Sequence, residues 1–437
     1  MQVTVSLTFD LPATGDVDSL EPIIVDAGRR AMAAALGAAC EEYEAMAGAC
    51  PYCGATALAA EGHDGRVVLC TFGRVELGLQ RLRCRECGRR FRPAEPFLAC
   101  LEGRNVSAKL REGAVLAGTS WPYAVAAGVL GDLCGAEISP ETVRRLANAA
   151  GAAEAKRQGA EAERVLSPTG EGVRREREEA LGKPLTGGDG PDLLLVGLDG
   201  GWVPSREQEG GMEGKVGVVA SEVEGIGHGR RRLSRRRYVA TFGDSRRLGA
   251  LAYGAAHALG GEEARRQQVL GDGAGWIKTE AEAHFPRALK TLDWGHAERK
   301  VHRAIRAALP GEGRRTRRKE LHAAIPERLW DGDAEGALLM LGRLRPEEGR
   351  EAIGALEEAI GYLQEQRGWL GDYARWREEG LCVGSGLVER AVELVINRRM
   401  KKRGMRWRRG NADAVVALRV CRLNNEWDDY IAAHPAA

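Results

Sequence analysis

Two pairs of cysteines have the residue type and the spacing of a metal site. Cys50 and Cys53 form one Cys-x2-Cys-Gly motif and Cys84 and Cys87 form another, with 30 residues between the two. Each short loop places two thiolates on one side of a tight turn, and two such turns complete a tetrahedral Zn²⁺ site. Four ordinary buried cysteines would not explain why the motif occurs twice. Because four thiolates leave no open coordination position, we expect one structural zinc ion.

Three acidic residues have the surroundings expected of a second site. Asp199 and Asp272 each end an apolar run of strand length and precede a glycine. A single Asp-Gly after a strand is usually a turn, but two of them favour a pair of carboxylates at the rim of one sheet. Glu389 lies in the first turns of a predicted helix, where an acid beside an apolar face is usually a solvated flank. Hard oxygen ligands of this kind suit Mg²⁺ or Mn²⁺ rather than zinc.

Positive charge is concentrated after Glu389. Residues 384–420 contain ten Lys or Arg and three Asp or Glu, a local net charge of +7, although the whole chain carries 64 Lys and Arg against 62 Asp and Glu. This distribution suits a catalyst that acts on a polyanion. A second basic run, with Arg235 and Arg236, precedes a predicted strand. Such a run is usually a solvated loop, but beside a nuclease site it could bind phosphates.

The elements that must position the acids form an α/β pattern. Apolar runs predict five strands, at 193–198, 215–220, 237–242, 268–270 and 288–292. Helical patterns at 245–259 and 275–284 alternate with the later strands, which favours a sheet covered by helices. From 299 to 379 the periodicity is helical only, interrupted at Pro310 and Pro346, and a last helix is predicted from 384 to 425.

The cysteine pairs lie in a separate N-terminal region. Helical patterns cover 20–49 and 106–150, and short strands are expected around 67–69 and 73–79. Ser139-Pro140-Glu141 has the N-cap, N1 proline and first-turn acid of a helix start. The predicted division is an N-terminal helical segment (1–49), a zinc ribbon (50–100), a helical region (101–160), a linker (161–190), the first part of a catalytic domain (191–298), an all-helical insertion (299–380) and the final acidic helix with a basic C-terminal region (381–437).

Length and composition limit the class of protein. The 437 residues are enough for several domains, and 44% hydrophobic residues exclude a chain that is disordered throughout. No apolar run approaches the length of about 18 residues that a membrane span needs, and Met1–Asp10 does not have the pattern of a signal peptide. We therefore expect a cytoplasmic, nucleoid-associated protein whose cysteines are thiols or metal ligands.

Four stretches together resemble the bacterial insertion-sequence transposases of the DDE class, which have an RNase H-like catalytic domain. The stretches are Gly197–Val203, Gly271–Ile277, Leu292–Ala297, and Gly384–Glu389 with Arg398–Trp407, and they occur in the order expected for such enzymes. The resemblance covers residues 190–425, and a preceding zinc ribbon and helical region also fit it.

The resemblance implies a role for each motif. Asp199, Asp272 and Glu389 would be the catalytic triad and would hold two Mg²⁺ or Mn²⁺ ions. Asp293 and His296 match an Asp-x2-His signature that follows the second aspartate in several transposase groups. We expect His296 to contact the scissile phosphate or to orient a ligand, unless it is a hydrogen-bonded structural histidine. The helices of 299–379 would be an insertion before the final acidic helix.

The expected fold is therefore an α/β RNase H-like catalytic domain with an all-α insertion, preceded by a small zinc ribbon and a candidate helix-turn-helix whose recognition helix would be 139–150. The expected function is metal-dependent cleavage and strand transfer at the ends of an insertion sequence in double-stranded DNA, by a homodimer or higher homo-oligomer. The residues expected to contact DNA are Arg235, Arg236, Arg398, Arg399, Lys401, Lys402, Arg403, Arg406 and Trp407.

Two alternatives stay open. The chain could be a transposase-derived DNA-binding protein without catalysis, or a structure-specific nuclease with an RNase H-like sheet. The presence of all three acids favours catalysis. The zinc ribbon and the long helical insertion weigh against the smaller nuclease architecture.

Overall fold

The computed structural model describes residues 2–166, 190–225, 231–344 and 350–433. The chain divides into two compact units, residues 1–150 with 427–437, and residues 151–426. Each unit is described by itself below. Among the described residues, no helix combines the length and the hydropathy that a membrane crossing needs.

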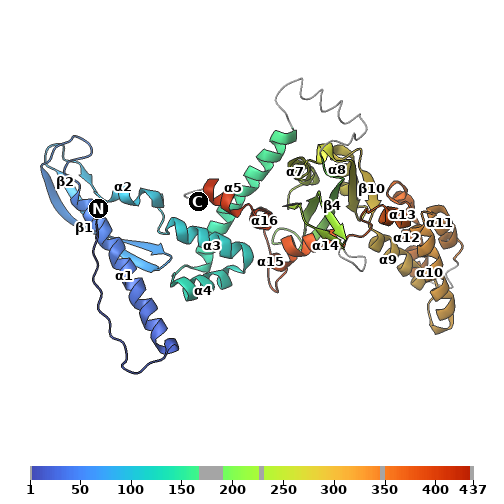
Figure 1. Cartoon of the computed structure of the whole chain (residues 1–437), viewed down its shortest axis with the longest axis horizontal. Helices are drawn as coiled ribbons and strands as arrows, with labels where there is room; N and C mark the ends of the chain where they lie inside the picture. Colours follow the sequence, from blue (N-terminus) through green and yellow to red (C-terminus); the bar gives the residue numbers. More distant parts are fainter. Residues whose placement is uncertain (1, 167–189, 226–230, 345–349, 434–437) are drawn as a thin grey trace, which may run out of the picture. The chain divides into compact units, whose positions relative to one another are not determined.

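A long helix and a small antiparallel sheet build the first part of the N-terminal unit. Helix α1 (Val17–Ala45) packs against a sheet of order β1-β2-β3 (Figure 1). The strands are β1 (Leu58–Cys70), β2 (Gly73–Cys84) and β3 (Arg90–Phe91). In β2 every second side chain is buried, because successive residues of a strand point to opposite faces. The two long strands are confirmed, and both extend well beyond the predicted segments.

Three further helices follow in the region expected to be helical. They are α3 (Ala108–Ser120), α4 (Tyr123–Cys134) and α5 (Pro140–Leu166), after the short α2 (Glu95–Leu98). The Ser139 hydroxyl accepts a hydrogen bond from the Thr142 N–H at 3.1 Å, which confirms the predicted start of α5. Helix α5 continues to Leu166, so the first residues of the segment expected to be a linker are helical. The remainder of that linker, 167–189, lies outside the described residues.

A mixed five-stranded sheet forms the centre of the second unit. Its order is β10-β9-β4-β5-β8, with antiparallel pairing of β4 to β5 and of β5 to β8, and parallel pairing of β4 to β9 and of β9 to β10. All five strands were predicted. Their bounds are Leu193–Val203 for β4, Met212–Ala220 for β5, Arg236–Thr241 for β8, Arg266–Gly271 for β9 and Leu289–Leu292 for β10.

The two faces of this sheet are covered by different helices. On β4, Leu194, Val196 and Leu198 belong to the core formed with α7 (Ser245–Ala258) and α8 (Gly275–His284). Leu195 points to the opposite face and belongs to the core formed with α14 (Gly386–Val392) and α16 (Arg409–Leu423). Because side chains alternate along a strand, Gly197, Asp199 and Gly201 also lie on the face that α14 covers.

In the described residues between β10 and α14, all the regular elements are helices, as predicted. It contains α9 (Trp294–Ala308), α10 (Arg315–Trp330), α11 (Ala334–Gly342), α12 (Arg350–Glu365) and α13 (Tyr373–Glu378). Pro310 separates α9 from α10 as expected, whereas Pro346 lies outside the described residues.

The prediction of one continuous helix from 384 to 425 is wrong. After α14 comes a π-helical turn (Glu393–Asn397) and the short α15 (Arg398–Met400), and residues 401–408 form a loop before α16. In this loop the Trp407 N–H donates to the Pro204 carbonyl at 2.9 Å, and the Arg206 N–H donates to the Trp407 carbonyl at 2.8 Å. These backbone groups bond to the segment after β4 and so are not used in a helix.

Candidate metal centres

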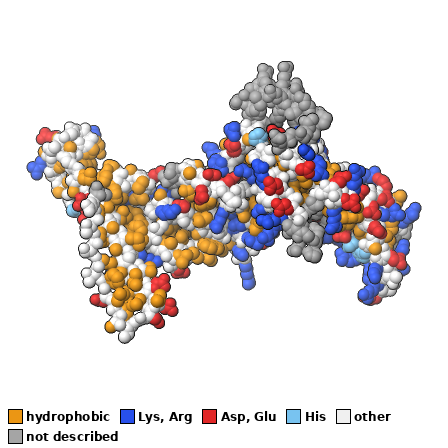
Figure 2. All heavy atoms as spheres, viewed as in Figure 1, with side chains coloured by type: hydrophobic (Ala, Val, Ile, Leu, Met, Phe, Trp, Pro, Cys, Tyr) orange, Lys and Arg blue, Asp and Glu red, His pale blue; other side chains and the backbone are white. Residues whose placement is uncertain are grey.

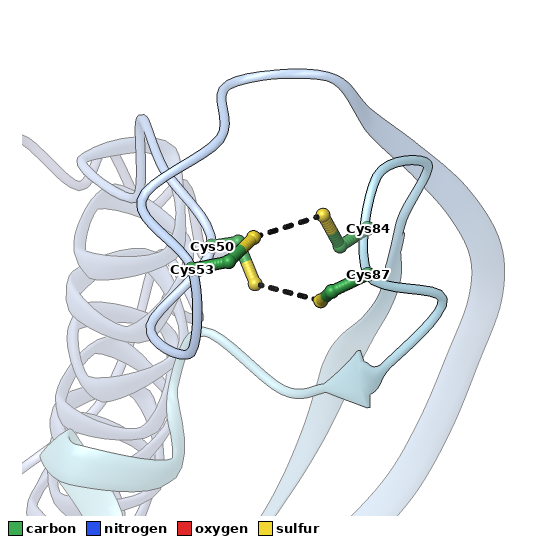
Figure 3. Close-up of side chains that lie close together, drawn as sticks. All are labelled: Cys50, Cys53, Cys84 and Cys87. Carbon is green, nitrogen blue, oxygen red and sulfur yellow. Dashed lines mark hydrogen bonds between the residues drawn. The ribbon is translucent and has the colours of Figure 1, made fainter.

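The four cysteine sulfurs converge as the motif spacing predicts. Figure 3 shows the two turns facing each other, with Sγ–Sγ distances of 3.7 Å between Cys50 and Cys87 and 3.6 Å between Cys53 and Cys84. All four sulfur atoms lie within 4.8 Å of one another. Four sulfurs bound to zinc at about 2.3 Å in a tetrahedron would be roughly 3.8 Å apart. The donor set and its dimensions therefore fit one zinc ion.

The two cysteine turns are built alike. The Cys50 N–H donates to the Ala55 carbonyl and the Cys84 N–H donates to the Arg89 carbonyl, both at 2.9 Å. Gly54 and Gly88 have φ angles of 75° and 71°, which glycine adopts without strain. Burial opposes ionisation of Cys50, but the backbone N–H groups of Tyr52 and Cys53 outweigh it and lower the pKa of this thiol to about 7.

The strand register brings the two predicted aspartates together on the second unit's sheet, although Asp199 lies within β4, opposite Val216 of β5, and does not end the strand as predicted. Parallel pairing places Gly197 of β4 opposite Leu270 of β9. Two residues further along the two strands, Asp199 and Asp272 therefore lie side by side. The Asp272 carboxylate accepts a hydrogen bond from the Ala274 N–H at 2.9 Å, which fixes the turn into α8.

Glycines allow α14 to lie close to the central strand. A Cβ atom on Gly197 would be 2.4 Å from Cγ2 of Val388, and one on Gly201 would be 2.9 Å from Cγ1 of Val392. Asp199 lies between these glycines on the same face of β4, and Glu389 follows Val388 on α14. The local sequence thus brings the third predicted acid toward the other two.

The other two acids and His296 are close enough to affect the ionisation of Asp199. Burial raises the pKa of Asp199 to about 6, the Gly200 N–H opposes this rise, and the negative charges of Asp272 and Glu389 add to it. His296 partly offsets the rise. A bound cation would favour the ionised form of this carboxyl group and so lower its pKa again.

Asp293 connects the end of β10 to the start of α14. Its side chain is 2% exposed, bonds to Nδ1 of His296, and accepts a hydrogen bond from the Ser385 N–H at 2.6 Å. The Ser385 hydroxyl lies 3.2 Å from Oε1 of Glu389. Burial opposes ionisation of Asp293, but the hydrogen bonds from His296 and Ser385 prevail and lower its pKa, while the bond to Asp293 raises the pKa of His296.

The helical insertion supports the Asp272 loop. Tyr362 of α12 donates to the Asp272 carbonyl at 2.8 Å, and Nε2 of Gln366 donates to the Gly273 carbonyl at 3.1 Å. Sequence reasoning did not find Tyr362, Gln366 or Ser385, because such contacts join segments that are far apart in the chain. The i, i+4 spacing of Ser385 and Glu389 was the only local signal for any of them.

The acidic group is more open than the cysteine group. Among the residues that the structure describes, only the four cysteines have all their ligand atoms within 4.8 Å of one another. Glu389 is 53% exposed, and its Oε1 lies 4.0 Å from a guanidinium nitrogen of Arg299. The structure thus brings Asp199, Asp272, Glu389 and His296 to one site without closing it around an ion.

The predicted DNA-contacting residues fall into two groups. Arg235, Arg398, Lys401, Lys402, Arg403 and Arg406 are exposed, and Lys and Arg side chains gather over α15 and the following loop in Figure 2. Arg399 and Trp407 are only 1% and 6% exposed, and the Arg399 guanidinium lies 5.1 Å from the centre of the Trp407 ring. Arg236 stacks on Tyr238 at 5.6 Å. Arg399 and Trp407 therefore shape the loop from inside, which is a change from their expected role at the surface.

Comparison with known proteins adds no family. The chain matches no model of a protein family and no curated protein.

Proposed function

We propose that the chain is a DNA transposase of the DDE class that cleaves phosphodiester bonds and transfers strands at the ends of its element. The observation that carries the proposal is the approach of Asp199, Asp272 and Glu389 to one another where α14 covers the sheet, with the pKa of Asp199 raised by burial and by the other two acids. Three carboxylates that repel one another in this way are costly unless they bind cations.

The topology supports an RNase H-like assignment of the catalytic unit. Three antiparallel strands (β4, β5, β8) are followed by two strands, β9 and β10, that extend the sheet in parallel from the other side of β4. The first acid lies on the central strand, the second follows its parallel neighbour, and the third lies on a helix against the same face. This is the arrangement that the resemblance in the sequence leads us to expect.

The residues of this site fit Mg²⁺ or Mn²⁺, because all three acids offer hard oxygen ligands. Bound ions of this kind would activate the attacking water or DNA 3′-hydroxyl and stabilise the leaving oxygen. The hydrogen bond to Asp293 raises the pKa of His296. The His296 imidazolium, which lies beside the three acids, could therefore pair with a DNA phosphate. The exposed Lys and Arg side chains of 398–409 would bind the DNA backbone.

The decisive experiment is incubation of the purified chain with the terminal DNA of its own element and Mg²⁺, followed by mapping of nicks and joined products at nucleotide resolution. Nicks at the element ends and joined strands would support the proposal. Binding without nicking by a folded preparation would favour the DNA-binding alternative. Cutting of branched DNA in place of element ends would favour the structure-specific nuclease.

A further inference from the structure

A second basic surface lies on the insertion, apart from the loop of 401–408. Residues 299–320 contain nine Lys or Arg and two Asp or Glu, a net charge of +7. They form α9, the turn after it and the start of α10. Lys and Arg side chains are visible at the end of this helical hairpin in Figure 2.

The exposed arginines of α9 are arranged on one face. Arg299, Arg303 and Arg306 are spaced i, i+4 and i+7, so they lie along one side of the helix. The side chains of Arg299 and Arg303 are 60% and 68% exposed. The opposite side of α9 is apolar and fully buried in the core of the unit, with Val301, Ala304, Ile305 and Ala308 each at 0% exposure. The helix is therefore held by its apolar face while the basic face is open.

This basic face begins at the acidic site. The guanidinium of Arg299 lies 3.9 Å from Oδ2 of Asp293 and 4.0 Å from Oε1 of Glu389. Helix α9 carries Arg299 and Arg306 seven residues apart, which corresponds to roughly 10 Å, or about three base pairs of DNA at 3.4 Å each. Its far end carries the turn into α10, where Arg315 and Lys319 are exposed on one face at i and i+4.

The turn is ordered by hydrogen bonds from its own arginine. A guanidinium nitrogen of Arg318 donates to the Leu309 carbonyl at 2.7 Å and to the Gly311 carbonyl at 2.6 Å. Below the turn, His302 and His322 pack edge to face with ring centres 4.4 Å apart. Burial, His302, Arg306 and Arg318 together lower the pKa of His322. Hydrogen bonds thus order the turn, and Arg306 and Arg318 lie close enough to His322 to affect its ionisation.

We infer that Arg299, Arg303, Arg306, Arg315 and Lys319, here called the insertion surface, bind the backbone of duplex DNA that extends away from the acidic site. The inference rests on the proposed function for the identity of the polyanion. Duplex DNA fits because the arginines of α9 form a line about three base pairs long that starts at the carboxylates, with Arg315 and Lys319 beyond the turn. The evenly spaced phosphates of the DNA backbone are what such a line can neutralise.

The test uses the full-length protein and a fluorescein-labelled 40-base-pair duplex of random sequence, without Mg²⁺, over a range of salt concentrations. A triple variant, Arg306→Gln with Arg315→Gln and Lys319→Gln, removes three positive charges at the far end of the insertion surface. The control triple, Arg328→Gln with Arg367→Gln and Arg375→Gln, removes three insertion arginines that each pair with a nearby acid, Asp333, Glu335 and Glu379.

We expect the first triple to weaken binding at least about ten-fold at 0.1 M salt and to reduce the slope of log K against log salt by about two to three. The control should change both values little. In the wild type, DNA should also raise the pKa of His322, followed by NMR, because phosphates would offset the charges of Arg306 and Arg318.

Three results would overturn the inference: equal losses in the two triples, an unchanged salt slope in the first triple, or tighter binding to a hairpin RNA of the same length than to the duplex. Failure of the proposed function gives a different pattern, since a wild type that binds duplex but never cuts element ends in Mg²⁺ would still show the expected salt slopes. Normal cutting and normal binding by the first triple would show that the insertion surface does not bind DNA, and would leave the proposed function intact.

Discussion

The three carboxyl groups of the acidic site can each be tested by a substitution that removes only the charge. Asp199→Asn, Asp272→Asn and Glu389→Gln keep side-chain shape and each remove one negative charge. We expect each to abolish Mg²⁺-dependent nicking and joining of element ends, because the proposed ions need that charge. DNA binding should persist or tighten, since a group that repels phosphates is gone. Nicking and binding assays on the same preparations check both expectations.

Two acids serve as controls for these substitutions. The Asp244 carboxylate accepts a hydrogen bond from the Arg247 N–H at 2.9 Å and caps α7, so Asp244→Asn should retain activity. Glu393 lies one turn after Glu389 and 3.7 Å from Nε of Arg398, and Glu393→Gln should lose only part of the activity. An active Glu389→Gln with an inactive Glu393→Gln would show that the wrong glutamate was assigned. Activity of Asp199→Asn or Asp272→Asn would rule out the metal site.

The raised pKa of Asp199 predicts a dependence of stability on pH. The folded state favours the protonated form, because the pKa of this group is about 6 in the fold against an ordinary 3.8. As the pH rises from about 4 to 6, ionisation of Asp199 therefore lowers the free energy of unfolding. Without added Mg²⁺, we expect Asp199→Asn to be more stable than the wild type at pH 7.5, by on the order of 2 kcal/mol, and nearly equal to it at pH 4. Urea unfolding at the two pH values measures this difference, and an equal difference at both would contradict the prediction.

Single residues show how far sequence reasoning extends. The cysteine motifs predicted their own convergence, because a Cys-x2-Cys turn is a local structure. The burial of Arg399 could not be predicted from the sequence. The Trp407 ring near its guanidinium is placed by hydrogen bonds of Arg406 and Trp407 to the segment after β4. Asp293 matched a signature, but its bond to the Ser385 N–H could be found only in the folded chain.

At the scale of elements, the approach of α14 to β4 depends on glycine. Gly197→Ala would place a Cβ atom 2.4 Å from Cγ2 of Val388, so helix and strand must separate. We expect a loss of about 1–3 kcal/mol in the free energy of unfolding and a larger fall in nicking than in DNA binding, because Glu389 moves with the helix. Urea unfolding and the nicking assay test this prediction.

An exposed helical glycine gives the matched control. In α12, a Cβ atom on Gly354 would meet no atom within 4 Å, so Gly354→Ala should stabilise the chain by roughly 0.5–1 kcal/mol and leave nicking unchanged. Unaltered stability and activity in Gly197→Ala would show that the close approach of α14 to β4 contributes to neither stability nor nicking.

The elements themselves were largely predictable. Strands and helices followed apolar periodicity, and all five strands of the central sheet were found in this way. What the periodicity could not give is which strands pair and where a helix is interrupted. The loop at 401–408 has no proline, but Gly404 has a φ angle of 81°, and the Trp407 backbone bonds to Pro204 and Arg206. The carbonyls of the π-helical turn before it are likewise bound by a distant group, since Arg419 donates to Leu394 and to Val395, the latter at 2.7 Å.

At the scale of the whole molecule, the two compact units predict separable effects. Cys50→Ser or Cys84→Ser should release one zinc ion per chain and loosen the N-terminal unit, because zinc binding and folding are coupled in such small modules. We expect recognition of element ends to weaken while the second unit stays folded. Metal analysis of the freshly purified, reduced protein and limited proteolysis measure these effects.

Cys100 gives the control for the cysteine substitutions. It is exposed and does not belong to the group of four, so Cys100→Ser should keep the zinc ion. Absence of zinc from the wild type, or full zinc content in Cys50→Ser, would contradict the assignment.

The wide spacing of the three acids along the chain has a consequence during synthesis. Glu389 is made 190 residues after Asp199, a delay of about 10–40 s at the usual rates of translation. All five strands of the sheet have left the peptidyl-transferase centre by residue 292, whereas the third carboxylate arrives only with α14. An incomplete product released by a stalled ribosome before that point carries two of the three acids. The proposed cutting activity is therefore confined to chains that extend past Glu389, and termination before that residue yields fragments that lack the third acid.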